Sequence, residues 1–156
     1  MSFIDTVDRI DIRAPKQRVY DVVCNYPAIT NWFPIYHCRL LDGTEVREGS
    51  RVEHMVGKPP RAVVNRFIRT VHRMLPGERI EETYDEGDLI GSGTWTFDER
   101  NGITTAAYHC AVRGNTLSMR MTFRLTGSFG HNVVYGRLLA ALKKHCERPV
   151  PVEQVL

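Results

Sequence analysis

The stretch that decides the fold is SFGHNVVYGRLLAALKKHC, residues 128 to 146. At about 100° per residue, a helix over this stretch gathers its apolar side chains on one side and most of its charged ones on the other. Ser128 is placed to cap the start of this helix, and Pro149 and Pro151 prevent it from continuing. We therefore expect one long amphipathic helix. Its apolar side consists of His131, Val134, Tyr135, Leu138, Leu139, Ala141, Leu142, His145 and Cys146.

Most of the chain before this helix has the alternation typical of strands, interrupted by turn signals such as Pro76-Gly77 and Asn101-Gly102. Pro15 suits the first turn of a short helix, and a second helical turn over AITNWF, residues 28 to 33, ends before Pro34. Antiparallel strands that follow one another in a meander are expected over residues 3–13, 36–41, 49–57, 62–74, 78–84, 89–97 and 104–112.

The segment from Thr116 to Leu125 has two interpretations. Apolar and polar residues alternate strictly along it, which favours a further strand. However, Leu117, Met121 and Leu125 also have the spacing of a helix that leads into the long one. We favour the strand.

The bulk properties fit one folded unit of ordinary size. The chain has 156 residues, of which 42% are hydrophobic, so we expect a single domain over residues 1–147 and a loose tail over 148–156. A formal net charge of +3 without blocks of Lys or Arg gives no reason to expect a nucleic-acid partner. No apolar run is long enough to span a membrane and no signal peptide is recognisable, so we expect a cytoplasmic protein. The sequence does not specify an oligomeric state.

Chemical motifs are sparse. The four cysteines are widely spaced and form no CxxC pair, so we expect reduced thiols and no zinc site. Three His-Cys pairs, at 37–38, 109–110 and 145–146, are interpreted as chance because zinc signatures have short, fixed ligand spacings. No phosphate-binding loop, HExxH motif or carboxylate pair stands out, and no cofactor is expected.

The order of the expected elements resembles the helix-grip fold of the START and birch-pollen-allergen superfamily, also called START-like or SRPBCC. The opening IDIRAPKQRVYDVVCNYPAITNWFP, residues 10–34, is similar to polyketide cyclase/dehydrase-type members, as are GSGTWTFDERNGITTAAYHC and the terminal LLAALKKHCE. The resemblance implies an α+β fold in which a curved antiparallel sheet of about seven strands wraps round the long C-terminal helix, with two short helices after the first strand. It also implies an apolar cavity between sheet and helix.

The candidate cavity residues come from faces that would point toward the long helix. Trp95 and Phe97 share a strand face with Gly91 and Gly93, where missing side chains would leave room for a helix or a ligand. His131 and Tyr135 would offer a proton-exchanging group and a phenol to a guest. The complete candidate set is Trp32, Phe67, Arg69, Glu82, Tyr84, Trp95, Phe97, His131, Tyr135 and Leu138.

Four of the candidates also have a purely structural interpretation. Trp32 can anchor the two short helices in the core, since buried Trp usually serves packing. His131 can sit half in water at the helix start. An Arg69–Glu82 pair inside the protein would orient a polar head group, but charged residues are seldom fully buried, so we expect this pair near the rim.

Three functions are compatible with these features. The first is binding or transport of a hydrophobic small molecule, such as a lipid, an isoprenoid or a polyketide-like aromatic. This molecule would be the protein's main partner. The second is a cyclase or aromatase in which His131, Tyr135 and Arg69 act as acid-base and orienting groups. The third is a protein-interaction module, which an outward-facing patch of Met119, Met121 and Phe123 would favour.

Overall fold

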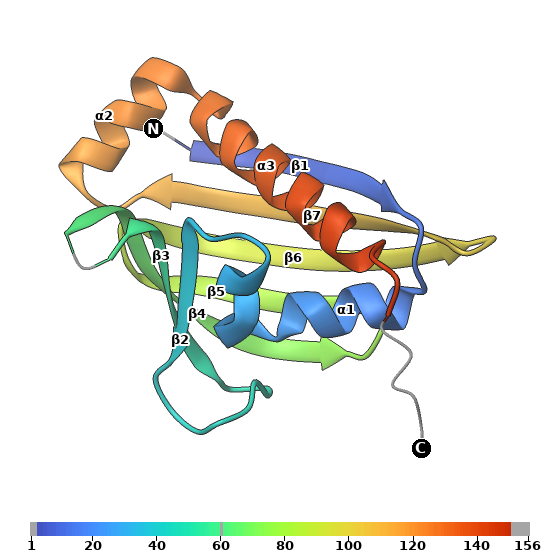
Figure 1. Ribbon diagram of the computed structural model, residues 1–156. Coiled ribbons are helices and arrows are strands. Elements are labelled where there is room, and N and C mark those ends of the chain that lie inside the picture. Colours follow the sequence, from blue (N-terminus) through green and yellow to red (C-terminus); the bar gives the residue numbers. More distant parts are fainter. Residues whose placement is uncertain (1–2, 60, 151–156) are drawn as a thin grey trace.

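The computed structural model describes residues 3–59 and 61–150. In this part of the chain, one curved antiparallel sheet forms a layer that the helices cover on a single face (Figure 1). The elements are β1 (Phe3–Ile12), α1 (Lys16–Cys24), the 3-10 helix η1 (Tyr26–Asn31), β2 (Tyr36–Leu40), β3 (Arg51–Lys58), β4 (Ala62–Leu75), β5 (Arg79–Gly87), β6 (Leu89–Arg100), β7 (Ile103–Gly114), α2 (Leu117–Thr126) and α3 (Phe129–Cys146).

Strands β2 to β7 form a meander, and β1 pairs with β7 as the edge strand at one side of the sheet. Its strand order is β1-β7-β6-β5-β4-β3-β2, and every neighbouring pair is antiparallel. The alternation in the sequence reappears as burial, because every second side chain of a strand points to the same face. Trp95 on β6 lies opposite Tyr108 on β7, and both are buried. The expected α+β helix-grip architecture is confirmed.

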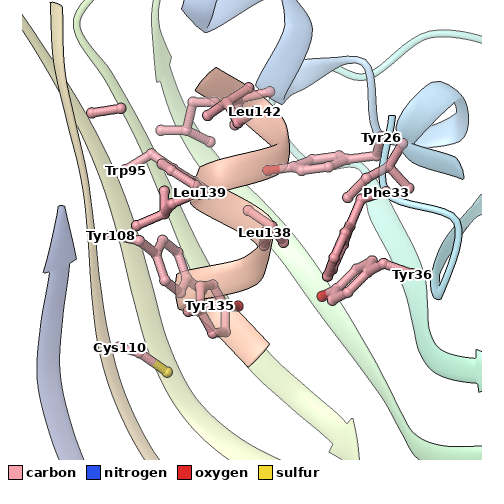
Figure 2. Close-up of a cluster of buried hydrophobic side chains, with 14 of the residues drawn as sticks. Tyr26, Phe33, Tyr36, Trp95, Tyr108, Cys110, Tyr135, Leu138, Leu139 and Leu142 are labelled. Carbon is pink, nitrogen blue, oxygen red and sulfur yellow. The ribbon is translucent and has the colours of Figure 1, made fainter. Parts of the chain in front are cut away.

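Helix α3 crosses the face of the sheet, as the amphipathic pattern predicted (Figure 1). Figure 2 shows its buried side chains between the sheet residues Trp95 and Tyr108 on one side and Tyr26, Phe33 and Tyr36 on the other. Ser128 occupies the N-cap position, but its side chain makes no capping hydrogen bond; its hydroxyl instead accepts one from the Asn132 amide at 3.3 Å. The buried residues of α3 are Tyr135, Leu138, Leu139, Leu142 and Cys146.

The strand favoured for residues 116–125 is wrong, because this segment forms helix α2. Strand β7 already pairs with β6 on one edge and with β1 on the other, so it has no free edge for another strand. Thr116 also stabilises the helix start, since its side-chain oxygen accepts a hydrogen bond from the Met119 amide at 3.2 Å. The helical spacing of the apolar residues, the alternative interpretation, is therefore the one that describes this segment.

The two short helices expected after the first strand are present as α1 and η1, and Trp32 is the C-cap of η1. All four cysteines are free thiols. Within the described ranges, no cluster of three potential metal ligands occurs and no helix is long and apolar enough to cross a membrane.

Gly93 has a specific packing role in the sheet. A Cβ atom built at this position would lie 2.0 Å from the hydroxyl oxygen of Tyr108, on the neighbouring strand β7. The room that the sequence suggested for a helix or ligand is thus taken by the Tyr108 side chain. We expect Gly93→Ala to lower the free energy of unfolding by about 1–3 kcal/mol, measured by urea denaturation, because Tyr108 has to shift.

The matched control is Gly136→Ala in α3, where an added Cβ meets nothing within 4 Å. Alanine is the better helix former, so this variant should be more stable by about 0.5–1 kcal/mol. Equal effects of the two substitutions would contradict the close approach of Tyr108 to Gly93.

Candidate functional site

A buried ion pair lies at the centre of the interior. Arg69 on β4 and Glu82 on β5 have side chains that are 3% and 0% exposed, and Arg69 Nη1 donates to Glu82 Oε2 at 3.2 Å. The expectation that this pair lies near the rim is therefore wrong. The strand alternation requires the burial, because Phe67, Arg69 and Val71 share the inward face of β4.

Phenol groups supply further hydrogen bonds to the ion pair, and Arg69 Nε stays buried without a partner. Arg69 Nη2 donates to the hydroxyl oxygens of Tyr84 at 2.6 Å and Tyr135 at 2.7 Å, and the Tyr26 hydroxyl donates to Glu82 Oε1. Burial raises the pKa of Tyr84 and of Tyr135, so both remain neutral phenols. Burial also raises the pKa of Glu82, whereas the charge of Arg69 and the Tyr26 hydrogen bond oppose that rise.

A second cluster of polar side chains, centred on His54 of β3, lies next to the Arg69–Glu82 network. Nδ1 of His54 lies 3.0 Å from the Tyr36 hydroxyl and 3.2 Å from the Cys38 sulfur, while its Nε2 is buried without a partner. The ring stacks on Phe67 with 5.4 Å between centroids. Burial, helped by the charge of Arg69, lowers the pKa of His54 well below its ordinary value, so this imidazole is neutral.

These side chains fill the middle of the molecule. Tyr108 stacks on Tyr135 at 4.8 Å between centroids, and only a void of about 20 Å³ remains beside the ion pair. Arg69, Trp95 and Leu138 border this void, which is too small for anything larger than a water molecule. The hollow interior implied by the resemblance is therefore not in the middle of the sheet.

A much larger cavity of about 420 Å³ lies at one end, between β3 and β4 of the sheet and the helices α2 and α3. Its volume is in the range of small-molecule sites, about 300–1,000 Å³. Helix α2 supplies Met119 and Phe123, and α3 supplies Val134. The full lining is Tyr36, Val56, Val64, Asn65, Phe67, Tyr84, Leu89, Ser118, Met119, Thr122, Phe123, Thr126, Gly127, Gly130, His131, Val134 and Tyr135.

A few polar atoms interrupt the apolar wall. The side-chain oxygen of Asn65 and both ring nitrogens of His131 are buried and have no hydrogen-bond partner. Tyr84 and Tyr135, whose hydroxyls accept from Arg69, line the same wall. Unpaired buried polar atoms are costly, and Asn65 and His131, which carry these atoms, belong to the residues that line the cavity.

His131 is not half in water, because only 8% of its side chain is exposed. Burial, and then the charge of Arg69, lower its pKa to about 4, so the imidazole is neutral at pH 7. The Asp8 carboxylate lies 3.7 Å from His131 Nδ1, beyond hydrogen-bond distance, and burial raises the pKa of Asp8. The ring stacks on Tyr135 at 4.3 Å between centroids, which holds it against the cavity.

The structure divides the ten residues predicted from the sequence into three places. Phe67, Tyr84, His131 and Tyr135 line the large cavity. Trp32 borders the small void and an open surface groove, together with Arg18 and His145, and it contacts the Phe33 ring. Arg69, Trp95 and Leu138 also border the small void, and Glu82 and Phe97 are packed in the core.

Sequence reasoning missed the contributions of α2, Tyr36 and Asn65 to the cavity. Asn65 shares a strand face with Phe67 and Arg69, so the alternation could have identified it. Met119 and Phe123 have the helical spacing i, i+4, which the preference for a strand concealed.

We predict that Arg69→Met lowers the free energy of unfolding by about 3–5 kcal/mol, since it leaves the Glu82 carboxylate buried without its cation. The double variant Arg69→Met, Glu82→Leu should recover most of this loss, because it removes both charges together. Urea denaturation of the two single variants and the double variant measures the coupling. Independent, additive losses would contradict a coupled pair.

The exposed pair Arg100 and Asp98 provides the control, with side chains 87% and 70% exposed. Arg100→Met should change stability by less than about 1 kcal/mol.

Solved structures of similar shape were found, although no family model and no curated protein matches the sequence. A START superfamily protein from Mycobacterium smegmatis is 16% identical, covers 92% of this chain and 97% of its own, and has a TM-score of 0.70. The ginseng major latex-like protein 151 from Panax ginseng is 10% identical, with 95% and 100% covered and a TM-score of 0.72.

An aromatase/cyclase from a Streptomyces species is also similar, at 16% identity, with 94% of each chain covered and a TM-score of 0.71. Identities this low establish the common fold and leave the activity open. The chain therefore has the helix-grip fold, as the resemblance of its sequence to the START and birch-pollen-allergen superfamily implied.

Proposed function

We propose that this protein binds an apolar small molecule of the lipid, isoprenoid or polyketide-like class in the cavity under α2. The observation that supports this proposal most directly is the cavity itself, with a volume of about 420 Å³ and walls that are largely aliphatic and aromatic. A guest gains roughly 25 cal/mol for each Å² of apolar surface that it removes from water. Burial alone can therefore supply most of the affinity.

The polar atoms on the wall specify what the guest should carry. A neutral imidazole offers one donor and one acceptor, and a phenol can do both. His131 and Asn65 present buried atoms without partners, and Tyr135 is already oriented by Arg69. We therefore propose a mostly apolar ligand with a single hydrogen-bonding group, such as a hydroxyl or carbonyl, directed at these side chains.

The cavity can be filled from α3 without disturbing the core. Gly130 lines it, and a Cβ built there meets nothing within 4 Å. We expect Gly130→Phe to weaken binding of a fluorescent fatty-acid analogue at least tenfold, because the ring occupies space that the probe needs. Native mass spectrometry of freshly purified protein measures in parallel whether a copurified guest is lost.

Gly136→Phe is the matched control, since Gly136 belongs to the same helix, is exposed and does not line the cavity. It should retain the affinity of the unmodified protein. The proposal would be overturned if the unmodified protein carried no guest and bound no probe at micromolar concentration.

The second candidate function is a cyclase or aromatase, favoured by the position of His131 beside the Arg69–Tyr135 hydrogen bond. A neutral imidazole can transfer a proton, and a phenol polarised by a guanidinium can stabilise an enolate oxygen. The similarity to the aromatase/cyclase is compatible with this function.

Turnover of a linear poly-β-ketone analogue distinguishes the two functions. If the protein is an enzyme, His131→Asn should lower the rate of cyclisation by about 100-fold or more while binding of the fatty-acid analogue persists. An unchanged rate would remove His131 from the mechanism, and no turnover by the unmodified protein would leave the binding function.

A further inference from the structure

The outer side of α2 is an apolar stripe that the described part of the chain leaves uncovered. Leu117, Met121 and Leu125 are 77%, 48% and 79% exposed, and their spacing of four residues aligns them on one side of the helix. Phe129, the first residue of α3, is 71% exposed. We call Leu117, Met121, Leu125 and Phe129 the α2 stripe.

The opposite side of α2 is occupied. Met119 and Phe123 line the cavity and pack against the core, so the helix has apolar residues on two sides. A surface helix that only covered a cavity would need one apolar side and a polar exterior. Leu117 and Leu125 contribute nothing to the cavity, so packing among the described residues does not account for them.

The charged side chains of α2 itself have one sign. Residues 115–146 contain no Asp or Glu, whereas α2 carries Arg120 and Arg124. Both arginines are exposed, and neither belongs to a salt bridge in the described structure. An exposed apolar stripe with basic residues beside it is complementary to a surface that is apolar within and anionic outside.

We propose that the α2 stripe docks on the surface of an anionic lipid bilayer. The leucines would enter the boundary between head groups and acyl chains, and Arg120 and Arg124 would contact the anionic head groups. Four apolar side chains on a short helix give weak, reversible attachment and no anchoring, so the attachment depends on the lipid charge.

Docking would also place the cavity at the membrane. Because α2 covers the cavity with Met119 and Phe123 and displays the stripe outward, the bilayer would lie next to the helix that separates it from the guest. Exchange of an apolar ligand between cavity and bilayer is a consequence that rests on the proposed function. Attachment itself does not depend on it.

Cosedimentation with vesicles tests the docking. The full chain should bind vesicles of phosphatidylcholine with phosphatidylserine, bind neutral phosphatidylcholine vesicles less, and dissociate as salt is raised. The variant Leu117→Asn, Leu125→Asn should lose at least tenfold in binding, since both side chains are more than three-quarters exposed and the fold does not need them. Arg124→Gln should weaken binding about fivefold, the effect of about 1 kcal/mol per basic residue at an anionic surface.

Matched controls come from the hairpin between β6 and β7, at the other end of the sheet (Figure 1). Ile103→Asn changes an apolar residue that is 42% exposed, and Arg100→Gln changes an exposed cation. Both should bind vesicles as the unmodified protein does.

Two results would overturn the proposal. One is that the unmodified protein does not bind vesicles, or that the leucine variant binds them as well as the unmodified protein does. The other is a dimer in sedimentation velocity that becomes monomeric in the leucine variant, without vesicle binding, which would assign the stripe to a second copy. Binding of the fatty-acid analogue in the cavity is measured on the same samples. It separates failure of docking from failure of the proposed function, because the leucine substitutions leave the cavity lining unchanged.

Discussion

The buried ion pair between Arg69 and Glu82 is the constraint on which the interior depends. Removing two charges from water costs several kcal/mol for each, so the pair is tolerated only where hydrogen bonds satisfy both ions. Tyr26 from η1 and Tyr135 from α3 supply two of these bonds. The charges are therefore satisfied only when the short helix, the long helix and the sheet are assembled together, so the pair specifies one arrangement of the three.

The same constraint explains where the cavity lies. Arg69 gathers aromatic rings, with its guanidinium carbon 4.4 Å from the centroid of Tyr84, and Tyr108 fills the space that Gly93 leaves. With the middle of the sheet filled in this way, the remaining space lies toward α2, where Met119 and Phe123 form the roof. The guest would then contact the outer phenols of the network, while the ion pair stays behind them.

Sequence periodicity predicted the parts of this arrangement that are local. The strand alternation placed Phe67, Arg69 and Glu82 on inward faces, and the 3.6-residue period identified α3. Two features needed information from distant residues. Strand β1 pairs with the second edge of β7, so Leu117–Thr126 cannot continue the meander as a neighbour of β7. The Tyr26 hydroxyl, 56 residues from Glu82, makes the burial of that carboxylate tolerable. Cavity volume depends on such distant packing, so it could not be derived from periodicity.

Helix α2 is held in place by fewer buried contacts than α3 is. None of its residues is fully buried, and apart from its own turns it is held by the Thr116 cap, by the hydrogen bond from Arg120 Nε to the Gly114 carbonyl of β7, and by Met119 and Phe123 against the core. Elements with few buried contacts open at a lower free energy than the rest of the fold. Helix α3, with its buried leucines and Tyr135, cannot move without breaking the Arg69 network. Displacement of α2 would therefore open the cavity to a guest while leaving the Arg69 network intact, and a surface that binds the outside of this helix would act on that entrance.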